Sequence, residues 1–500
     1  MMADVPIRSD LSGVRTSSKR RTRALVATFV AASVLGATGM AARVALGAST
    51  STSTSALESR SRSVVRPVPF FVRAGRKFAS ANAALAYCQL GGCSTAKQLE
   101  TLYDMTPLYA KGENGKGVTI AVVDAFGSPT IVHDLAYFDR VMKIPNPPKL
   151  TIIQPAGKVP PFNPGNSDVV GWATETTLDV ECAHAMAPGA DILLVETPVD
   201  ETEGTAGFPQ IEKAEKYVVD HHLAEVISQS FGATEQTFPD KRSLLSLRGA
   251  YLDAAAHNVT VLAASGDQGA TDVRVMKAGG DIYFTHRAVV WPASDPLVTA
   301  VGGTFVDRVA GGRAKPDSVW NTTSDGFGPA ASGGGLSLDF PRPSWQKAVS
   351  SVVGASRGLP DVALEASPQD PALIYMSIPG EASGFYPLSG TSEATPLFAG
   401  IVAVADQVAR APLGLLNPAL YALGESRAPG LVDVRSGGNS VAFVQNGHDY
   451  SVSGWSARPG FDLASGWGTI NGDKLVEELA ARHLHEHDRS RHQRRAFRRS

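Results

Sequence analysis

A serine at the start of a long apolar helix, Ser392, is placed where its hydroxyl could act as a nucleophile. It stands in "LSGTSEATPLFAGIVAVADQ", where Gly390 permits a tight turn and the residues that follow favour a helix. Free backbone N–H groups and the positive end of the helix dipole meet at a helix N-terminus, so they would stabilise negative charge on a bound carbonyl oxygen. These surroundings suit acyl transfer. For a single serine, a plain helix N-cap is the alternative.

Two carboxylates four residues apart could supply the base that such a serine needs. Glu175 and Asp179 lie in "GWATETTLDVECAHAMAP", and on a helix this spacing puts both side chains on one face. Two acids at that distance repel and tend to share a proton, so one can act as a base at low pH while the other orients it. The alternative is a solvated helix face, although the apolar neighbours Leu178 and Val180 favour a helix packed on a sheet.

A third acid, Asp267, follows an apolar run in "AASGDQGA" and stands beside glycine. Loop aspartates next to glycine commonly form turns. At the carboxyl end of a strand, however, a protonated carboxylic acid can donate a hydrogen bond to an oxyanion. Acidic pH, or burial that raises the pKa, would keep it neutral.

Histidine is the usual partner of a catalytic serine, and the best-placed one in this chain is His184. It lacks the glycine-rich surroundings of the histidine in subtilisins, so we interpret it as a core or helix-end residue. Asp124, in "IAVVDAFGSPT", sits where subtilisins carry their aspartate. Without the matching histidine motif it cannot complete that triad.

Apolar segments alternating with helices must position these residues. Continuous apolar runs predict strands over 117–125, 190–196, 225–232, 259–269 and 297–303. Helical patterns separate several of them, at 173–187, 209–223 and 243–257. This alternation predicts an α/β fold with a mainly parallel central sheet and helices on both faces. In such folds chemistry gathers at the carboxyl ends of the strands.

The two ends of the chain differ from its middle. The first 80 residues carry 13 basic and 3 acidic side chains and the last 20 carry 7 and 2, against a net charge of −2 for the whole chain. The middle is therefore acidic, which argues against nucleic acid as a partner. A basic segment (1–23) precedes an apolar one (24–48) that predicts a signal peptide or a membrane anchor. We expect a linker or short pro-segment over 49–96, the folded domain over 97–480 and a basic disordered tail over 481–500.

Cysteine usage is compatible with export but not with a disulfide framework. Cys88 and Cys93 in "CQLGGC" could close a small loop after export, whereas Cys182 is expected to be buried packing. We expect an extracellular or cell-surface protein.

Taken in order, these motifs resemble the sedolisins, serine-carboxyl peptidases related to subtilisin in which a glutamate replaces the histidine. The similarity covers about residues 97–475, through "DAFGSPT", "TETTLDVECAHAMAPGADI", "VISQSFGATE", "ASGDQGA", "WPASDPLVTAVGGT", "LPDVALEASP", "SGTSEATPLFAG" and "LLNPALYAL". The resemblance implies a subtilisin-like fold and an acid-active endopeptidase or tripeptidyl-peptidase acting on proteins or peptides. It makes Ser392 the nucleophile, Glu175 the general base and acid, Asp179 the residue that orients Glu175, and Asp267 the oxyanion donor.

The family also has one calcium (Ca²⁺) site near its C-terminus, built from carboxylates and backbone carbonyls, which are hard oxygen ligands. The resemblance implies that Asp433 and Asp462 supply the carboxylates here, and that Val434, Arg458 and Gly460 supply the carbonyls. Arg458 stands where the family usually has glycine.

Two rival interpretations stay open beside the sedolisin one. A subtilisin-type hydrolase would use Asp124, His184 and Ser392, and a change at His184 would destroy its activity. A secreted binding protein would keep the fold without turnover. Sedolisins usually carry a large folded prodomain, whereas here we expect only the segment 49–96 to precede the domain. We expect a monomer.

Overall fold

The computed structural model describes residues 72–73, 77–201, 204–275, 281–309, 312–313, 315–325 and 328–497. They all belong to a unit that spans Arg60–Ser500. The predicted basic segment (1–23) and the predicted signal peptide or anchor (24–48) lie outside the described residues. Within the described ranges, no helix combines the length and the apolar character needed to cross a bilayer.

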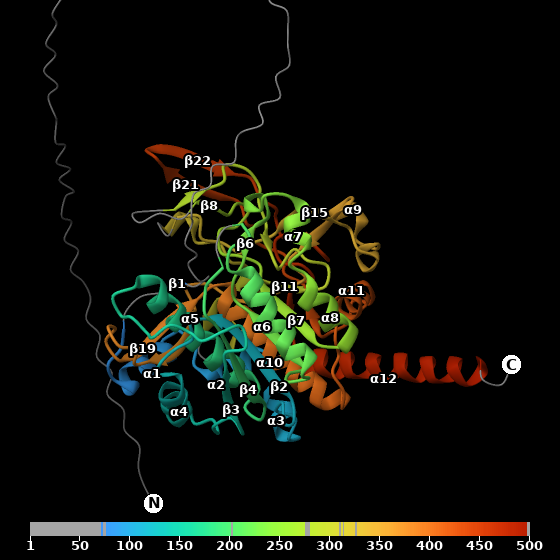
Figure 1. Cartoon of the computed structure of the whole chain (residues 1–500), viewed down its shortest axis with the longest axis horizontal. Coiled ribbons are helices and arrows are strands. Elements are labelled where there is room, and N and C mark those ends of the chain that lie inside the picture. Colours follow the sequence, from blue (N-terminus) through green and yellow to red (C-terminus); the bar gives the residue numbers. More distant parts are fainter. Residues whose placement is uncertain are drawn as a thin grey trace, which may run out of the picture. The chain divides into compact units, whose positions relative to one another are not determined.

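An eight-stranded sheet runs through the domain, as the apolar runs predict (Figure 1). In spatial order its strands are β14 (Ser318–Val319), β11 (Thr299–Phe305), β7 (Thr260–Ala264), β5 (Val226–Gln229), β2 (Thr119–Ala125), β4 (Asp191–Thr197) and β3 (Leu150–Ile153). Strand β17 (Val362–Glu365) also pairs with β11. All pairings are parallel except that of β14 with β11. The five predicted strands are confirmed, although β5 and β7 end earlier than expected.

Successive residues of the central strands face opposite sides of the sheet. In β2, Ile120 and Val122 join one apolar core, whereas Ala121 and Val123 join the other. Helices α5 (Ser167–Met186) and α10 (Thr391–Ala409) pack into the first core, and α6 (Phe208–Asp220) and α8 (Gly249–His257) pack into the second (Figure 1). With both faces covered, the strands need no polar residues on either side, which explains their continuous apolar runs.

Smaller elements complete the fold. The remaining helices are α1 (Ala81–Gln89), α2 (Ala96–Leu102), α3 (Thr106–Ala110), α4 (Ile131–Met142), α7 (Lys241–Leu245), α9 (Ser350–Val353), α11 (Asn417–Ser426) and α12 (Gly472–Phe497). Strands outside the main sheet include β1 (Val72–Arg73), β12 (Arg308–Val309), β18 (Ala372–Met376), β19 (Gly384–Ser389) and β22 (His448–Val452). The helix predicted over 243–257 is in fact two, α7 and α8.

The folded part of the chain begins before residue 97, so the predicted linker over 49–96 is wrong for its described residues. Helix α1 buries Ala84 and Cys88, and Cys88 forms a disulfide with Cys93, as predicted. Upstream of it, β1 pairs antiparallel with β19, with Val72 opposite Ser389. The Ser- and Arg-rich composition of the preceding segment hid this short helix. Tertiary contacts and the disulfide, rather than a long periodic pattern, hold it in the fold.

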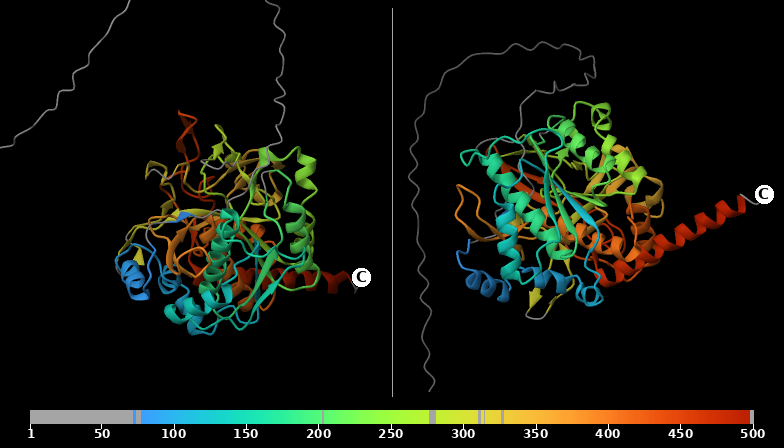
Figure 2. Two further views of the ribbon diagram at one scale, coloured as in Figure 1. Left: turned by 60° about the vertical axis from the view of Figure 1, so that its left-hand side comes forward. Right: turned by 60° about the horizontal axis from the view of Figure 1, so that its bottom comes forward.

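The C-terminal prediction also needs correction. Helix α12 continues through most of the predicted disordered tail (481–500), and its last turns project beyond the other described elements (Figure 2). The sequence from 473 to 497 contains no glycine or proline and is rich in Arg, Glu and His. A helix already formed over its apolar start can therefore propagate through the charged part.

Candidate active site

Ser392 lies in the first turn of α10, just after the chain leaves strand β19. Gly390 has a φ of 121°, which favours glycine, and its N–H donates to the carbonyl oxygen of Ala366 at 2.9 Å. The N-cap position falls on Gly390, so Ser392 itself is not an N-cap residue. Its side chain is fully buried, and within the described chain its hydroxyl has no hydrogen-bond partner.

Glu175 and Asp179 occupy successive turns of α5, which packs directly against α10. All of α5 from Trp172 to Met186 is buried, so the alternative of a solvated helix face is wrong. Neither carboxyl oxygen of Glu175 has a hydrogen-bond partner among the described residues, yet the Ser392 hydroxyl is near enough to lower its pKa. Such contacts often tighten only once substrate is bound. Ser230 Oγ donates to Asp179 Oδ1 at 2.9 Å and holds that carboxyl in place.

The electrostatic environment disfavours charge on both acids. Burial raises the pKa of Glu175 and of Asp179 well above the usual range, because the ionised form loses its hydration. Nearby negative charges add to this: Asp124 and Asp267 raise the pKa of Glu175, and Asp124 and Glu175 raise that of Asp179. Acids that interact this strongly keep protons well above pH 4, so the pair can store a proton close to the serine.

Asp267 reaches the nucleophile turn from the end of β7. Its Oδ1 accepts hydrogen bonds from the N–H of Thr391 at 2.8 Å and from the Thr391 hydroxyl at 2.7 Å. Its Oδ2 is buried and has no partner in the described part of the chain. Burial raises the pKa of Asp267 to about 7. Below that pH the side chain is a neutral acid with one oxygen anchored and the other available as a donor, which is the chemistry that an oxyanion requires.

His184 is engaged elsewhere, as its interpretation as a structural residue predicts. It is buried in the last turn of α5, where its Nε2 lies 2.9 Å from the carbonyl oxygen of Pro145 and 3.3 Å from Asp139 Oδ1. Asp124, by contrast, joins the acids around Glu175. It is buried near the end of β2, and burial raises its pKa to about 7. Cys182 is buried and unoxidised on α5, as predicted.

Three residues at this site escaped the sequence analysis. Ser230 binds Asp179 and Thr391 binds Asp267, although each pair is far apart in sequence. Glu393, an acid directly after the serine, is fully buried. Only the last left a signal in the sequence, since a charged residue interrupts an otherwise small and apolar helix start.

The predicted calcium ligands lie on two loops that meet. Asp433 Oδ1 accepts a hydrogen bond from the Gly460 N–H at 3.1 Å, and Asp462 Oδ2 accepts one from the Arg458 N–H at 2.8 Å. Val434 follows Asp433 and is buried. Within the described ranges no group of three or more His, Cys, Asp or Glu side chains converges as a metal site would. Two carboxylates facing one short loop with backbone carbonyls are nonetheless a donor set that fits calcium.

Comparison with known proteins finds serine peptidases among the relatives of this chain. Residues 166–420 match the model of the subtilase family. The chain is 34% identical to kumamolisin from Bacillus sp. (strain MN-32) over 397 residues, covering 77% of this chain and 64% of that protein. It is 29% identical to sedolisin from Pseudomonas sp. (strain 101), covering 76% of this chain and 60% of that protein. The chain thus spans less than two thirds of the length of these relatives.

A solved structure shows the same fold over most of the domain. Pseudomonas sedolisin, a serine-carboxyl proteinase complexed with two molecules of pseudo-iodotyrostatin, superposes with a TM-score of 0.62 at 26% identity. The match covers 78% of this chain and 99% of the other. Human tripeptidyl-peptidase 1 is 30% identical over 321 residues, covering 61% of this chain and 51% of that protein. The chain therefore belongs to the subtilase family and, within it, to the sedolisins, which share the subtilisin-like fold.

Proposed function

We propose that this chain is a serine-carboxyl peptidase that cleaves peptide bonds at acidic pH. In the reactive form the Glu175–Asp179 pair holds one proton, which sits on Asp179 and holds Glu175 in position. The ionised Glu175 then takes the proton of the Ser392 hydroxyl, which attacks the substrate carbonyl. Asp267 and the Ser392 backbone N–H donate hydrogen bonds to the tetrahedral oxyanion. Glu175 then gives its proton to the leaving amine, and water, deprotonated by Glu175, releases the acyl group from the serine.

One observation carries the proposal: the buried hydroxyl of Ser392 and the buried carboxyl of Glu175 lie close to each other, and both lack a hydrogen-bond partner in the described part of the chain. Ser392 Oγ and both oxygens of Glu175 lack hydrogen-bond partners among the described residues. A buried polar group left without a partner costs about 1–3 kcal/mol, so most folds avoid it. Two such groups on facing helices are expected where a substrate completes the contacts.

The acidic optimum follows from the protonation state of Asp267. It must be neutral to donate a hydrogen bond, and its pKa of about 7 keeps it neutral in acid. As the pH rises through 7 the donor is lost and a carboxylate faces the developing oxyanion instead. Both effects raise the barrier, so activity should fall on the alkaline side.

We propose protein or peptide substrates, and action outside the cell after export through the segment 24–48. The same machinery serves an endopeptidase or a tripeptidyl-peptidase, and the lengths of the released fragments distinguish the two. The full chain should be incubated with a peptide library from about pH 3 to 8 and the products identified by mass spectrometry. The proposal predicts cleavage in acid, no cleavage by Ser392→Ala, and labelling of Ser392 by a peptide aldehyde. A protein that cleaves nothing and resists the label would instead be a binding protein of the same fold.

We also propose one calcium ion between the loops that carry Asp433 and Asp462. In the present arrangement Asp433 Oδ2 accepts a hydrogen bond from Arg435 Nε at 2.7 Å, and a calcium ion would replace this cation. Calcium should raise the melting temperature of the wild type, whereas magnesium at the same concentration should not, because it demands a more rigid octahedral site. Asp433→Asn should abolish the calcium effect, and Asp449→Asn, an exposed aspartate on β22, should retain it. An Asp433→Asn protein that still gains stability from calcium would exclude this site.

A further inference from the structure

Glu393 is an acid that the proposed mechanism does not use, although it directly follows the nucleophile. Its side chain is fully buried in the first turn of α10. Neither of its carboxyl oxygens has a hydrogen-bond partner among the described residues. An acid near a helix N-terminus is usually exposed and ionised, because the helix dipole favours its charge. The position of Glu393 near the helix N-terminus favours a negative charge, but the side chain has no contact with the water that would solvate this charge.

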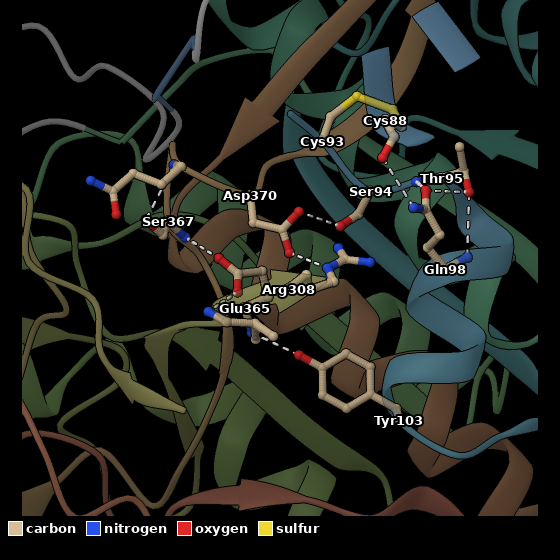
Figure 3. Close-up of polar contacts among 12 residues, drawn as sticks. Cys88, Cys93, Ser94, Thr95, Gln98, Tyr103, Arg308, Glu365, Ser367 and Asp370 are labelled. Carbon is tan, nitrogen blue, oxygen red and sulfur yellow. Dashed lines mark hydrogen bonds and ion pairs between the residues drawn. A yellow bond between two sulfur atoms is a disulfide. The ribbon is translucent and has the colours of Figure 1, made fainter. Parts of the chain in front are cut away.

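A second acid, Asp370, stands beside Glu393 and already holds the nearest cation. Asp370 Oδ2 pairs with Arg308 Nε at 2.5 Å, and Asp370 Oδ1 accepts a hydrogen bond from Ser94 Oγ at 2.9 Å (Figure 3). Ser94 follows the disulfide-bonded Cys93, so this pair also ties the N-terminal segment to the domain. The charge of Arg308 is therefore largely neutralised by Asp370 before Glu393 can use it.

A third acid, Glu365 at the end of β17, completes the cluster. Its Oε1 accepts the N–H of Ser367 at 2.7 Å (Figure 3). Its Oε2 accepts the N–H of Val306, also at 2.7 Å. Two N–H donors favour the ionised form of a carboxyl. Glu365 is thus better prepared for charge than Glu393, whose pKa is lowered by one backbone N–H, that of Ala372.

The groups facing Glu393 make its ionisation costly. The negative charge of Asp370 raises the pKa of Glu393, and the positive charge of Arg308 lowers it by less. Glu365 and the thiol of Cys182 on α5 also interact with Glu393. Asp317, in turn, adds negative charge next to Asp370. Three buried carboxyls share one guanidinium, so the cluster is uncharged overall only if two of them carry protons. Burial raises the pKa of Glu393 well above its usual range.

We propose that Glu393 is a positioning residue for Ser392, and that it works only while its carboxyl is neutral. This inference rests on the proposed role of Ser392. A neutral Glu393 fills the space between the nucleophile turn and the loop 365–372, and the Gly390 N–H bond to Ala366 joins the same two segments. An ionised Glu393 must reach water or the buried Nη2 of Arg308, which has no partner among the described residues. Either movement pulls the first turn of α10 away from Glu175.

The test is the alkaline limb of the pH profile of kcat, measured at once after mixing at a temperature where the protein stays folded. In the wild type, two ionisations, those of Asp267 and Glu393, should each stop catalysis, so log kcat should fall with a slope approaching about −2. In Glu393→Gln only the ionisation of Asp267 remains, so log kcat should fall with a slope of about −1. One unit above both midpoints the variant should keep about tenfold more of its maximal activity than the wild type.

Asp406→Asn is the matched control. Asp406 is another buried acid of α10 with a raised pKa, but it lies 13 residues further along the helix, about 20 Å from Glu393. Removing it should leave the slope unchanged. If Glu393→Gln keeps the wild-type slope, or if Asp406→Asn reduces the slope equally, the proposal is wrong.

Melting temperatures separate this inference from the proposed function. Glu393→Gln should unfold at the wild-type temperature near pH 4 and at a higher temperature than the wild type near pH 8, because the charge penalty exists only there. This difference can be measured even if the wild type cleaves no peptide, which would refute the proposed function alone. A difference that is the same at every pH would overturn the role of the charge. If Glu393→Gln and Glu393→Met both fail to fold at pH 4, a neutral side chain of this size cannot replace Glu393, and the proposed role of its neutral form is also excluded.

Discussion

Replacing Asp267 separates its role as a hydrogen-bond donor from its role in holding the nucleophile turn. In Asp267→Ala the oxyanion loses one donor, which typically costs about 2.7–4 kcal/mol, or about 10²–10³ in kcat. The Thr391 N–H also loses its acceptor, so the free energy of unfolding should fall by about 1–3 kcal/mol. Asp267→Asn keeps both functions, because an amide can accept through Oδ1 and donate through Nδ2.

The assay is steady-state cleavage of one peptide substrate across the acidic and neutral range, with the melting temperature as the control for folding. At the acidic optimum Asp267→Asn should lose at most about tenfold in kcat and Asp267→Ala about 10²–10³. Because the amide does not ionise, Asp267→Asn should also lose less activity than the wild type as the pH rises through 7. If Asp267→Ala stays folded and within about threefold of the wild type, the oxyanion role is refuted.

Three further predictions concern the rest of the domain. His184→Ala should change kcat/KM by no more than about threefold while lowering the melting temperature, because His184 contacts the Pro145 carbonyl oxygen and not the nucleophile. A loss of activity without a loss of stability would support the subtilisin-type triad instead. The free energy of unfolding should fall by several kcal/mol between about pH 4 and pH 8. Acids such as Asp124 and Asp272 have pKa values near 4 when unfolded and about 7 when folded, so the folded state binds more protons and loses stability as the pH rises. Urea titrations in which the stability stays flat or rises over this range would contradict the prediction. Reducing the disulfide between residues 88 and 93 should cost about 2 kcal/mol of stability, by the loop-entropy estimate, and an unchanged urea midpoint would show that the link adds nothing.

The central sheet and the main catalytic candidates could be predicted from sequence because their signals are local. Continuous apolar runs such as those of β2 and β4 are typical of strands in a sheet that is covered on both faces. The four-residue spacing of Glu175 and Asp179 fixes a shared helix face, and Asp267 follows a strand directly. Each of these inferences needs only neighbours along the chain.

The parts that could not be predicted depend on segments distant in sequence. Ser230, which follows β5, meets Asp179 of α5 across 51 residues of sequence. Glu393 is buried, and the groups that act on it, Asp370 and the N–H of Ala372, come from a segment more than 20 residues earlier in the chain. Helix α1 is short and follows a polar segment, so its place in the domain depends on tertiary packing and a disulfide. The charged composition of the last part of α12 predicts disorder when this segment is considered alone. Composition does not show that a helix formed by the preceding residues can extend into it.

The most direct test of the whole account is the value of kcat for Glu175→Gln at the acidic optimum. An amide of the same shape cannot accept the serine proton, so kcat should fall by about 10²–10⁴ while KM and the melting temperature stay close to those of the wild type. If kcat stays within about tenfold of the wild type, a carboxylate is not the base that activates Ser392.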